Sequence, residues 1–319
     1  MRIIMMGTGQ FAVPMFRLLH SSQHDVVLLV TRPERSHRGR GPKPRNPMRE
    51  VAEELGVPVL MPQDINSPEA ADELSGWPAD LLLVCDYGQI LSPEVLALVK
   101  HGGLNLHGSL LPSYRGAAPV NWAIYHGDKE TGVTVIHMTP KLDGGPCVGV
   151  ARTSIERGET AVGLEQRLSE MGAPLTLDAI NHLEAGELEA IPQDPAAVTK
   201  APKLKKSDGL VDWNRCAIEL FNQVRAFQPW PTTFTYLLRE RGEPLRVILE
   251  QVEYGNEQNE GLQAASPGTV VVATSDQLHV ATGRGLLKIL RIQPSGKRVL
   301  SVEEFLRGYP VAPGERFGA

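Results

Sequence analysis

The chain has 319 residues, which is long for a single hydrophobic core and enough for two domains. Hydrophobic residues make up 42% and charged residues 22%, proportions that exclude disordered and fibrous classes. The net charge of -5 argues against a general affinity for nucleic acid, although local basic clusters can still provide one.

The sequence contains no apolar run near the roughly 18 residues of a membrane-spanning helix. It opens on a strand-like segment without a signal peptide, so we expect a cytoplasmic protein with no membrane partner. Its cysteines, Cys85, Cys147 and Cys216, lie far apart without metal-binding spacing. We therefore expect buried free thiols, with neither a disulfide framework nor a metal site.

The first two thirds of the chain alternates strand-like and helix-like segments. Runs rich in leucine and β-branched residues predict strands at 2–6, 26–31, 81–85, 104–107 and 133–138. Helical spacing and early prolines predict helices at 11–21, 47–55, 93–100, 119–126 and 164–183. This alternation is typical of an α/β fold with a doubly wound, mostly parallel sheet.

The pattern changes near residue 190. Residues 191–207 hold three prolines and four lysines without periodicity, which is typical of a linker. Beyond it, a helix at 217–227 and short strands at 233–238, 245–250, 269–273, 278–281 and 286–292 predict a smaller antiparallel barrel, of the OB-like type. The expected division is a first domain at 1–190, a linker at 191–207 and a second domain at 208–319.

The stretch GLNLHGSLLP (103–112) places polar groups at the end of a predicted strand. Alternation sends Leu104 and Leu106 to one face of the sheet and Asn105 and His107 to the other. Ligands of open α/β sheets bind at the carboxyl ends of strands. An amide can donate to a developing oxyanion, and an imidazole can add a donor or move a proton, so this pair suits chemistry at a carbonyl.

A glycine-rich loop, KLDGGP (141–146), follows the strand predicted at 133–138. We expect Asp143 to return toward the same edge of the sheet, where a carboxylate would fix the tautomer of an imidazole and favour its charged form. Taken singly, Asn105 could be a turn former, His107 a strand-end histidine and Asp143 a loop cap. Together at one sheet edge, they favour a catalytic site.

The segment GTGQFA (7–12) fits the glycine pattern of dinucleotide-binding turns. The second predicted strand, however, is followed by Arg32 and not by the acidic residue that holds the ribose of NAD. Arg32 could accept the phosphate of NADP, so an NADP oxidoreductase stays as an alternative, beside a tight turn that binds no dinucleotide. The oxidoreductase would leave the polar set described above unexplained.

The motif NLHGSLLP (105–112), with LDG (142–144), closely resembles the signature of formyltransferases that use 10-formyltetrahydrofolate. Its extension YRGAAPVNWA (114–123) is similar to the methionyl-tRNA formyltransferase family, and so are segments at 1–14, 203–231 and 292–308. The chain departs from that family at Gly9-Gln10, where Pro-Asp is usual, at Asp86, where a small residue is usual, and at Gly144, where threonine is common.

The resemblance implies a Rossmann-like catalytic domain joined to an OB-like barrel that binds tRNA. It implies transfer of a formyl group from the co-substrate 10-formyltetrahydrofolate to initiator methionyl-tRNA, by a monomer in the bacterial cytoplasm without a metal. Asn105 and His107 would stabilise the oxyanion, while Asp143 would hold His107 and a water that relays a proton to folate N10. The implied folate-binding residues are Asp86, Tyr87, Gly88, Ile90, Ser109, Leu110, Leu111 and Pro112.

Basic residues gather in two stretches. Residues 32–49 contain seven basic residues and one acid and resemble the family's insertion loop, which reaches the acceptor stem, although a solvated surface loop would have the same composition. Residues 284–298 contain no acid and, with the lysines before residue 207, could follow tRNA phosphates. The expected tRNA-binding residues are Arg38, Arg40, Lys43, Arg45, Lys205, Lys206, Arg284, Lys288, Lys297 and Arg298.

Two further alternatives stay open. A formyltransferase acting on another amine, such as a sugar nucleotide, would share the catalytic residues, but a small substrate needs no basic surface on the barrel. A noncatalytic RNA-binding protein would explain the basic stretches and the barrel. It would not require Asn105.

Overall fold

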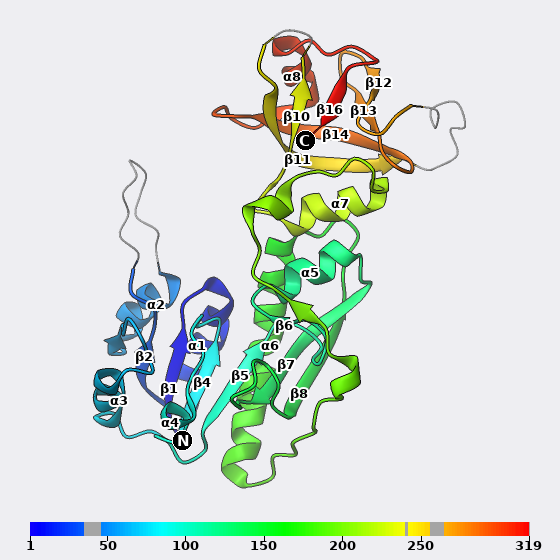
Figure 1. Cartoon of the computed structure of the whole chain (residues 1–319). Coiled ribbons are helices and arrows are strands. Elements are labelled where there is room, and N and C mark those ends of the chain that lie inside the picture. The colour runs from blue at the N-terminus through cyan, green and yellow to red at the C-terminus, as the bar shows by residue number, and fades with distance from the viewer. Residues whose placement is uncertain (35–45, 240–241, 256–264, 319) are drawn as a thin grey trace. The chain divides into compact units, whose positions relative to one another are not determined.

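The computed structural model describes residues 1–34, 46–239, 242–255 and 265–318. The chain forms two compact units (Figure 1). The first comprises residues 1–119, 130–154 and 163–202, and the second comprises 120–129, 155–162 and 203–319. The second unit therefore includes most of helix α5 (Pro119–His126), which comes from the first half of the sequence. The functional division at residues 190 and 208 stays a prediction.

The first unit contains a seven-stranded sheet with the order β3-β2-β1-β4-β5-β7-β8. The strands from β1 to β5 run parallel, whereas β7 and β8 are antiparallel to their neighbours. The α/β fold with a mostly parallel sheet is thus confirmed. The bounds are β1 Arg2–Gly7, β2 Asp25–Val30, β3 Val59–Leu60, β4 Leu81–Cys85, β5 Gly103–His107, β7 Glu130–His137 and β8 Cys147–Ser154.

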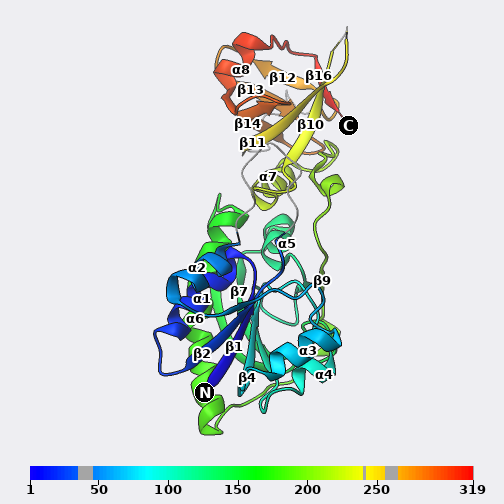
Figure 2. The ribbon, with the colours of Figure 1, turned by 90° about the vertical axis from the view of Figure 1, so that its left-hand side faces the viewer.

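Helices cover both faces of this sheet, with α1, α2 and α6 on one side and α3 and α4 on the other (Figure 2). Leu74 of α3 and Val95 of α4 share a buried cluster with Ile4 of β1. On the opposite face, Gly172 of α6 lies so close to Leu106 that a Cβ atom would collide with that side chain. The bounds are α1 Val13–His20, α2 Pro47–Leu55, α3 Pro68–Ser75, α4 Pro93–Leu96 and α6 Ala161–Ala185, with a 3-10 turn at Gln10–Ala12.

The second unit contains α7 (Ala217–Ala226), α8 (Val302–Gly308) and an antiparallel sheet with the order β12-β13-β14-β11-β10-β16. Further hydrogen bonds join Val270 to Glu315 and Gly268 to Phe317, so the sheet is nearly closed. The expected barrel is therefore present. The bounds are β10 Thr233–Leu238, β11 Leu245–Gly255, β12 Val270–Ala273, β13 Leu278–Ala281, β14 Leu286–Pro294, β15 Leu300–Ser301 and β16 Arg316–Gly318.

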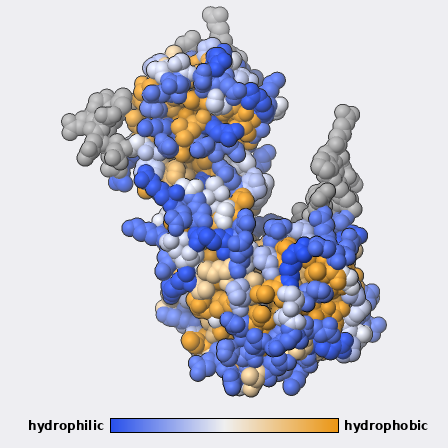
Figure 3. All heavy atoms as spheres, turned by 180° about the vertical axis from the view of Figure 1, so that it is seen from behind, coloured by the Kyte–Doolittle hydropathy of each residue, from blue (hydrophilic) through white to orange (hydrophobic). Residues whose placement is uncertain are grey.

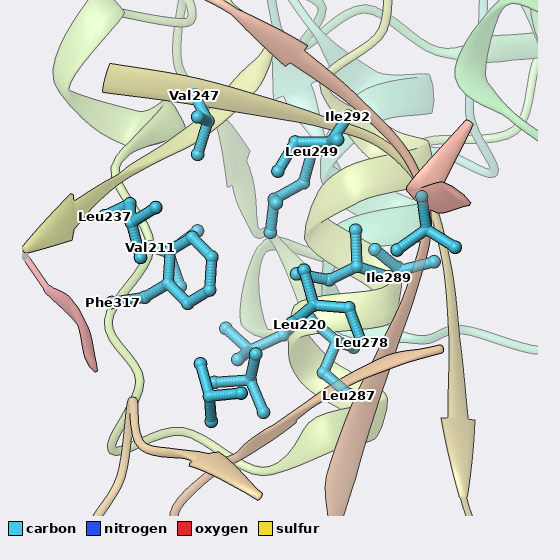
Figure 4. Close-up of a cluster of buried hydrophobic side chains, with 14 of the residues drawn as sticks. Val211, Leu220, Leu237, Val247, Leu249, Leu278, Leu287, Ile289, Ile292 and Phe317 are labelled. Carbon is cyan, nitrogen blue, oxygen red and sulfur yellow. The ribbon is translucent and has the colours of Figure 1, made fainter. Parts of the chain in front are cut away.

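Alternating side chains of the barrel strands point inward and form one apolar core (Figure 4). The helix α7 contributes Leu220, which is fully buried against this core. Burial of this apolar surface is the main contribution to folding of the unit. The labelled members are Val211, Leu220, Leu237, Val247, Leu249, Leu278, Leu287, Ile289, Ile292 and Phe317.

Hydrophilic side chains predominate on the face shown in Figure 3, and apolar side chains form patches between them. Among the described residues, no helix is both long and apolar enough to cross a membrane.

The neighbours Leu237 and Leu238 on β10 provide a matched test of the barrel core. Leu237 is 2% exposed and Leu238 is 38% exposed. We expect Leu237→Ala to lower the free energy of unfolding of the second unit by about 2–5 kcal/mol, because it removes transfer energy and leaves a cavity. Leu238→Ala should lower the free energy of unfolding by well under half of that amount. Urea unfolding followed by tryptophan fluorescence measures both, and equal losses would contradict this assignment of the core.

Candidate active site

The register of β5 places the expected polar pair as its alternation predicts. Leu104 and Leu106 are buried, with exposed fractions of 0% and 3%. Asn105 and His107 lie on the other face of the strand, with His107 paired to Thr134 of β7. Within the described part of the chain, the Asn105 side-chain amide has no hydrogen-bond partner. Its N–H groups are therefore available to a ligand.

His107 is held between two oxygen atoms. Its Nε2 lies 2.9 Å from the carbonyl oxygen of Tyr114, and since a carbonyl can only accept, Nε2 donates. Its Nδ1 lies 3.8 Å from the Oδ2 of Asp143. That carboxylate oxygen accepts a hydrogen bond of 2.9 Å from the backbone N–H of Gly116. The structure thus brings His107 and Asp143 together, with Asn105 two residues back on the same face.

Asp143 reaches His107 by a different route from the expected one. Because β7 runs antiparallel to β5, it ends beside the start of β5, where the N–H of Met138 donates to the carbonyl of Gly103 at 2.8 Å. The loop between β7 and β8 then returns along β5 toward His107. Asp143 itself has a left-handed backbone with a φ of 47°. The proximity of the two side chains therefore depends on the loop and not on a shared strand end.

The loop after β5 contains four of the expected folate-binding residues. The Thr134 hydroxyl donates to the carbonyl of Ser109 at 2.7 Å and accepts from the N–H of Leu111 at 3.1 Å. Ser109 is fully buried, and its hydroxyl donates to the carbonyl of Ser113 at 2.6 Å. Leu110, Leu111 and Pro112 are half-buried. Ser109 thus stabilises the loop internally, while its neighbours have surface for a ligand.

The end of β4 contributes a carboxylate to this edge of the sheet. Asp86 has a left-handed backbone with a φ of 48°, and a Cβ atom on Gly9 would collide with its carboxylate. The Asp86 carboxylate therefore occupies the space that a side chain at position 9 would need. Of the other expected residues here, Tyr87 is buried, whereas Gly88 and Ile90 are exposed.

Two carboxyl groups in this region have raised pKa values. Surrounding protein atoms reduce the hydration of Asp86, which remains open to solvent, and raise its pKa to about 6. Desolvation raises the pKa of Glu165 on α6 to about 7, with a further contribution from the charge of Asp86. This edge of the sheet therefore carries less negative charge near pH 6 than its composition suggests.

The expected tRNA-binding residues are dispersed. Arg38, Arg40, Lys43 and Arg45 lie outside the described residues. Lys205 and Lys206 are exposed at the start of a 3-10 turn, Lys206–Gly209. Arg284 precedes β14 and Lys297 follows it, so the nine residues of that strand separate them by roughly 30 Å. Lys288 lies between these ends, and Arg298 forms an ion pair of 2.7 Å with Glu304. Arg284, Lys288 and Lys297 are therefore spread along β14.

Residues 191–201, part of the segment 191–207 that is expected to form a linker, are bonded to both site loops. Ile191 pairs with Cys147 through two backbone hydrogen bonds of 2.8 Å. The short strand β9 (Lys200–Ala201) pairs with β6 (Arg115–Gly116). Gln193 bonds the loop that carries Asp143. Neither Gln193 nor Thr134 could be predicted from the sequence, because an isolated polar residue in an aperiodic segment or on a strand gives no pattern.

Among the described residues, no group of three or more histidine, cysteine, aspartate or glutamate side chains could hold a metal ion.

The raised pKa of Asp86 predicts a pH-dependent effect of Asp86→Asn. The pKa of Asp86 lies near 6 in the folded state, whereas its unperturbed value is 3.8. Ionisation of Asp86 therefore destabilises the folded state as pH rises between about 4 and 6. We expect Asp86→Asn to raise the Tm at about pH 7.5, and the difference to shrink toward zero near pH 4. Glu94→Gln is the opposite control, since a hydrogen bond from Ser92 lowers the pKa of Glu94, so this variant should lower the Tm at neutral pH. A pH-independent effect of Asp86→Asn would contradict the prediction.

Comparison with known proteins identifies the family. Residues 1–180 match the formyl transferase domain, and residues 203–310 match the formyl transferase C-terminal domain. The chain is 43% identical to the methionyl-tRNA formyltransferase of Rhodopirellula baltica, covering 99% of this chain and 96% of that protein. It is 41% identical to the protein of the same name from Methylobacillus flagellatus, with both chains fully covered.

Solved structures share the fold at lower identity. WlaRD, a sugar 3N-formyl transferase, is 14% identical with a TM-score of 0.66, over 93% of this chain and 99% of that one. HypX from Aquifex aeolicus is 18% identical with a TM-score of 0.64, over 98% of this chain, which spans about half (48%) of HypX. The two matched domains and the full-length similarity together place this chain in the formyl transferase family, among the methionyl-tRNA formyltransferases.

Proposed function

We propose that this chain transfers the formyl group of 10-formyltetrahydrofolate to the α-amino group of methionine on initiator methionyl-tRNA. The observation that carries the proposal is the convergence of Asn105, His107 and Asp143 on one face of β5, in a chain about 40% identical to methionyl-tRNA formyltransferases over its full length. The proposal includes the cytoplasmic location and the monomeric state expected above.

Asn105 acts at the carbonyl oxygen of the formyl group. As the amine attacks the formyl carbon, negative charge develops on that oxygen, and a fixed N–H donor stabilises it more strongly than the neutral carbonyl. The unpartnered amide of Asn105 supplies this donor from a strand whose register is fixed by buried leucines. Removing one such donor typically raises the barrier by about 3 kcal/mol.

Asp143 handles the proton and holds His107, which stabilises the oxyanion beside Asn105. The attacking amine must lose a proton, and folate N10 must gain one as its bond to the formyl carbon breaks. His107 donates from Nε2 to the Tyr114 carbonyl, which leaves Nδ1 facing Asp143. The carboxylate orders a water between the two nitrogen atoms of the substrates, and this water relays the proton from the amine to N10.

The two loops beside this set provide the folate site. Leu110, Leu111 and Pro112 offer partly exposed apolar surface after β5, and Ile90, 62% exposed, does so after β4. Both loops lie at the carboxyl ends of neighbouring parallel strands, where ligands of such sheets bind. Apolar walls with a few polar groups suit a flat, largely aromatic co-substrate.

The barrel binds the phosphate backbone of tRNA. Basic residues spread over roughly 30 Å along β14 match an extended polyanion better than a small substrate. Such contacts supply affinity and orientation, and the expected loop residues between 35 and 45 would read the end of the acceptor stem.

The direct test is transfer of labelled formyl from 10-formyltetrahydrofolate to purified methionyl-tRNA. We expect initiator methionyl-tRNA to be formylated and elongator methionyl-tRNA to react far more slowly. Asn105→Ala should lower kcat about 100- to 1,000-fold, because it removes a donor used in the transition state. Asn181→Ala is the matched control, since that asparagine accepts from the side chains of Gln23 and His24 near the start of β2, away from the site loops. Full activity of Asn105→Ala, or transfer only to a small amine, would contradict the proposal.

The salt dependence of binding tests the barrel surface. We expect Lys288→Ala combined with Lys297→Ala to raise KM for tRNA and to reduce the slope of log affinity against log salt by roughly 1 to 2, with kcat unchanged. Arg307→Ala is the control, because Arg307 is a basic residue of the same unit that pairs with Glu303 at 2.6 Å. An unchanged salt slope in the double variant would exclude these lysines from the tRNA contact.

A further inference from the structure

Gln193 connects two parts of the site at one point. Its Nε2 donates to the carbonyl of Asp143 at 2.8 Å and to the carbonyl of Gly145 at 2.7 Å. Its Oε1 accepts from the Nε and Nη2 of Arg115, at 3.1 and 2.7 Å. Every donor and acceptor of the Gln193 amide is therefore used, and each partner belongs to the site: two in the Asp143 loop and one on β6.

The two carbonyls bonded by Gln193 lie on either side of Gly144. Since Asp143 has a φ of 47°, its backbone is in a conformation that L-residues rarely adopt without outside support. A Cβ atom on Gly144 would lie 3.3 Å from Arg115 Nη1 and 2.8 Å from the Cβ of Lys141. Gly144 is thus closely packed between Arg115 and Lys141. The Gln193 amide stabilises the turn through its bonds to the two flanking carbonyls.

This turn sets the direction of the Asp143 carboxylate. With the backbone of Asp143 fixed, its Oδ2 accepts from the Gly116 N–H at 2.9 Å and faces His107 Nδ1 at 3.8 Å. Gly116 follows Arg115 on β6, so the same residue pair ties both the backbone and the carboxylate of Asp143 to one short strand. Loss of the Gln193 side chain would remove the hydrogen bonds to the carbonyls of Asp143 and Gly145 that fix this loop.

Gln193 has no comparable role in the core of the first unit. Its neighbours Ile191 and Asp194 are exposed, and Gln193 itself is half-buried. The pairing of β9 with β6 and of Ile191 with Cys147 keeps the segment in place without it. Loss of the Gln193 side chain should therefore change the loop more than the stability of the fold.

We propose that Gln193 is a positioning residue, which acts on formyl transfer by holding the Asp143 carboxylate against His107. This inference rests on the proposed function. Gln193 does not touch the reacting atoms, and its effect passes through Asp143. It therefore predicts an energetic coupling between positions 193 and 143 that a residue supporting only the fold would not show.

A double-mutant cycle of Gln193→Met and Asp143→Asn tests this coupling in steady-state formylation of initiator methionyl-tRNA. We expect Gln193→Met to lower kcat about 10- to 100-fold in the native background, since small misplacements of reacting groups cost this much. KM for both substrates should stay within about twofold. In the Asp143→Asn background, the same change should cost less than about twofold. Gln193→Glu should be as slow as Gln193→Met, because it keeps the acceptor for Arg115 but has no N–H donor.

Gln223 offers a matched control in the second unit. Its Nε2 also donates to two carbonyls, those of Asp208 and Leu210, at 3.0 and 3.1 Å. Gln223→Met removes the same kind of bonds, and we expect its effect on kcat to be the same with and without Asp143→Asn. Its Tm should fall more than that of Gln193→Met, because Gln223 is 1% exposed.

The outcomes separate the two proposals. If the native protein formylates initiator methionyl-tRNA and the effects of Gln193→Met and Asp143→Asn multiply independently, the positioning role is wrong. Full activity of Gln193→Met would also overturn it. If the native protein itself transfers no formyl group, the proposed function is wrong. The activity of the native protein alone shows this, without the double-mutant cycle.

Discussion

The burial of Leu104 and Leu106 on one face of β5 determines where the polar groups of the site can lie. A strand has a side-chain period of two, so a slip of one residue would send both leucines to the opposite face and bury Asn105. Parallel pairing with β4 and antiparallel pairing with β7 hold the register on both edges. The position of Asn105 and His107 is thus stabilised by the same apolar burial that stabilises the sheet.

The rest of the site is built from loops that this strand alone cannot hold. Asp143 approaches His107 only because the loop after β7 returns along β5, and its backbone there is in a left-handed conformation. Hydrogen bonds from outside the loop hold it in this conformation. Residues 191–201 supply them through backbone pairing and through the side chain of Gln193. A segment without periodicity can therefore determine the geometry of a site.

Elements with a strong local signal could be predicted from the sequence. The strand at 103–107 and the helices α2 and α5 follow from apolar alternation, early prolines and helical spacing. α3 was missed although it begins with Ser67 as N-cap and Pro68 in the first turn, signals that the sequence contains. β8 was missed because its apolar residues are few and only partly buried at the edge of the sheet. Short strands that pair over long sequence separations, such as β6 with β9, have no local signal at all.

The residues of the candidate site also fall into two groups: those that the sequence could predict and those that it could not. Asn105, His107 and Asp143 could be singled out because their residue types suit one reaction and their motifs are compact. Gln193 could not, since its role depends on a contact across 50 residues of sequence. The sequence likewise gives no sign that Gly9 and Asp86 are neighbours, and only the structure shows that a Cβ atom on Gly9 would collide with the Asp86 carboxylate.

The most direct test of the catalytic arrangement is a crystal structure with 5-formyltetrahydrofolate, a stable isomer of the formyl donor. We expect the pterin between the loops that follow β4 and β5, the Asn105 side-chain nitrogen about 2.7–3.1 Å from the formyl oxygen, and Asp143 on the side from which the amine approaches. A folate bound elsewhere on the first unit, with its formyl group away from Asn105 and His107, would contradict the assignment of this face of β5 as the catalytic centre.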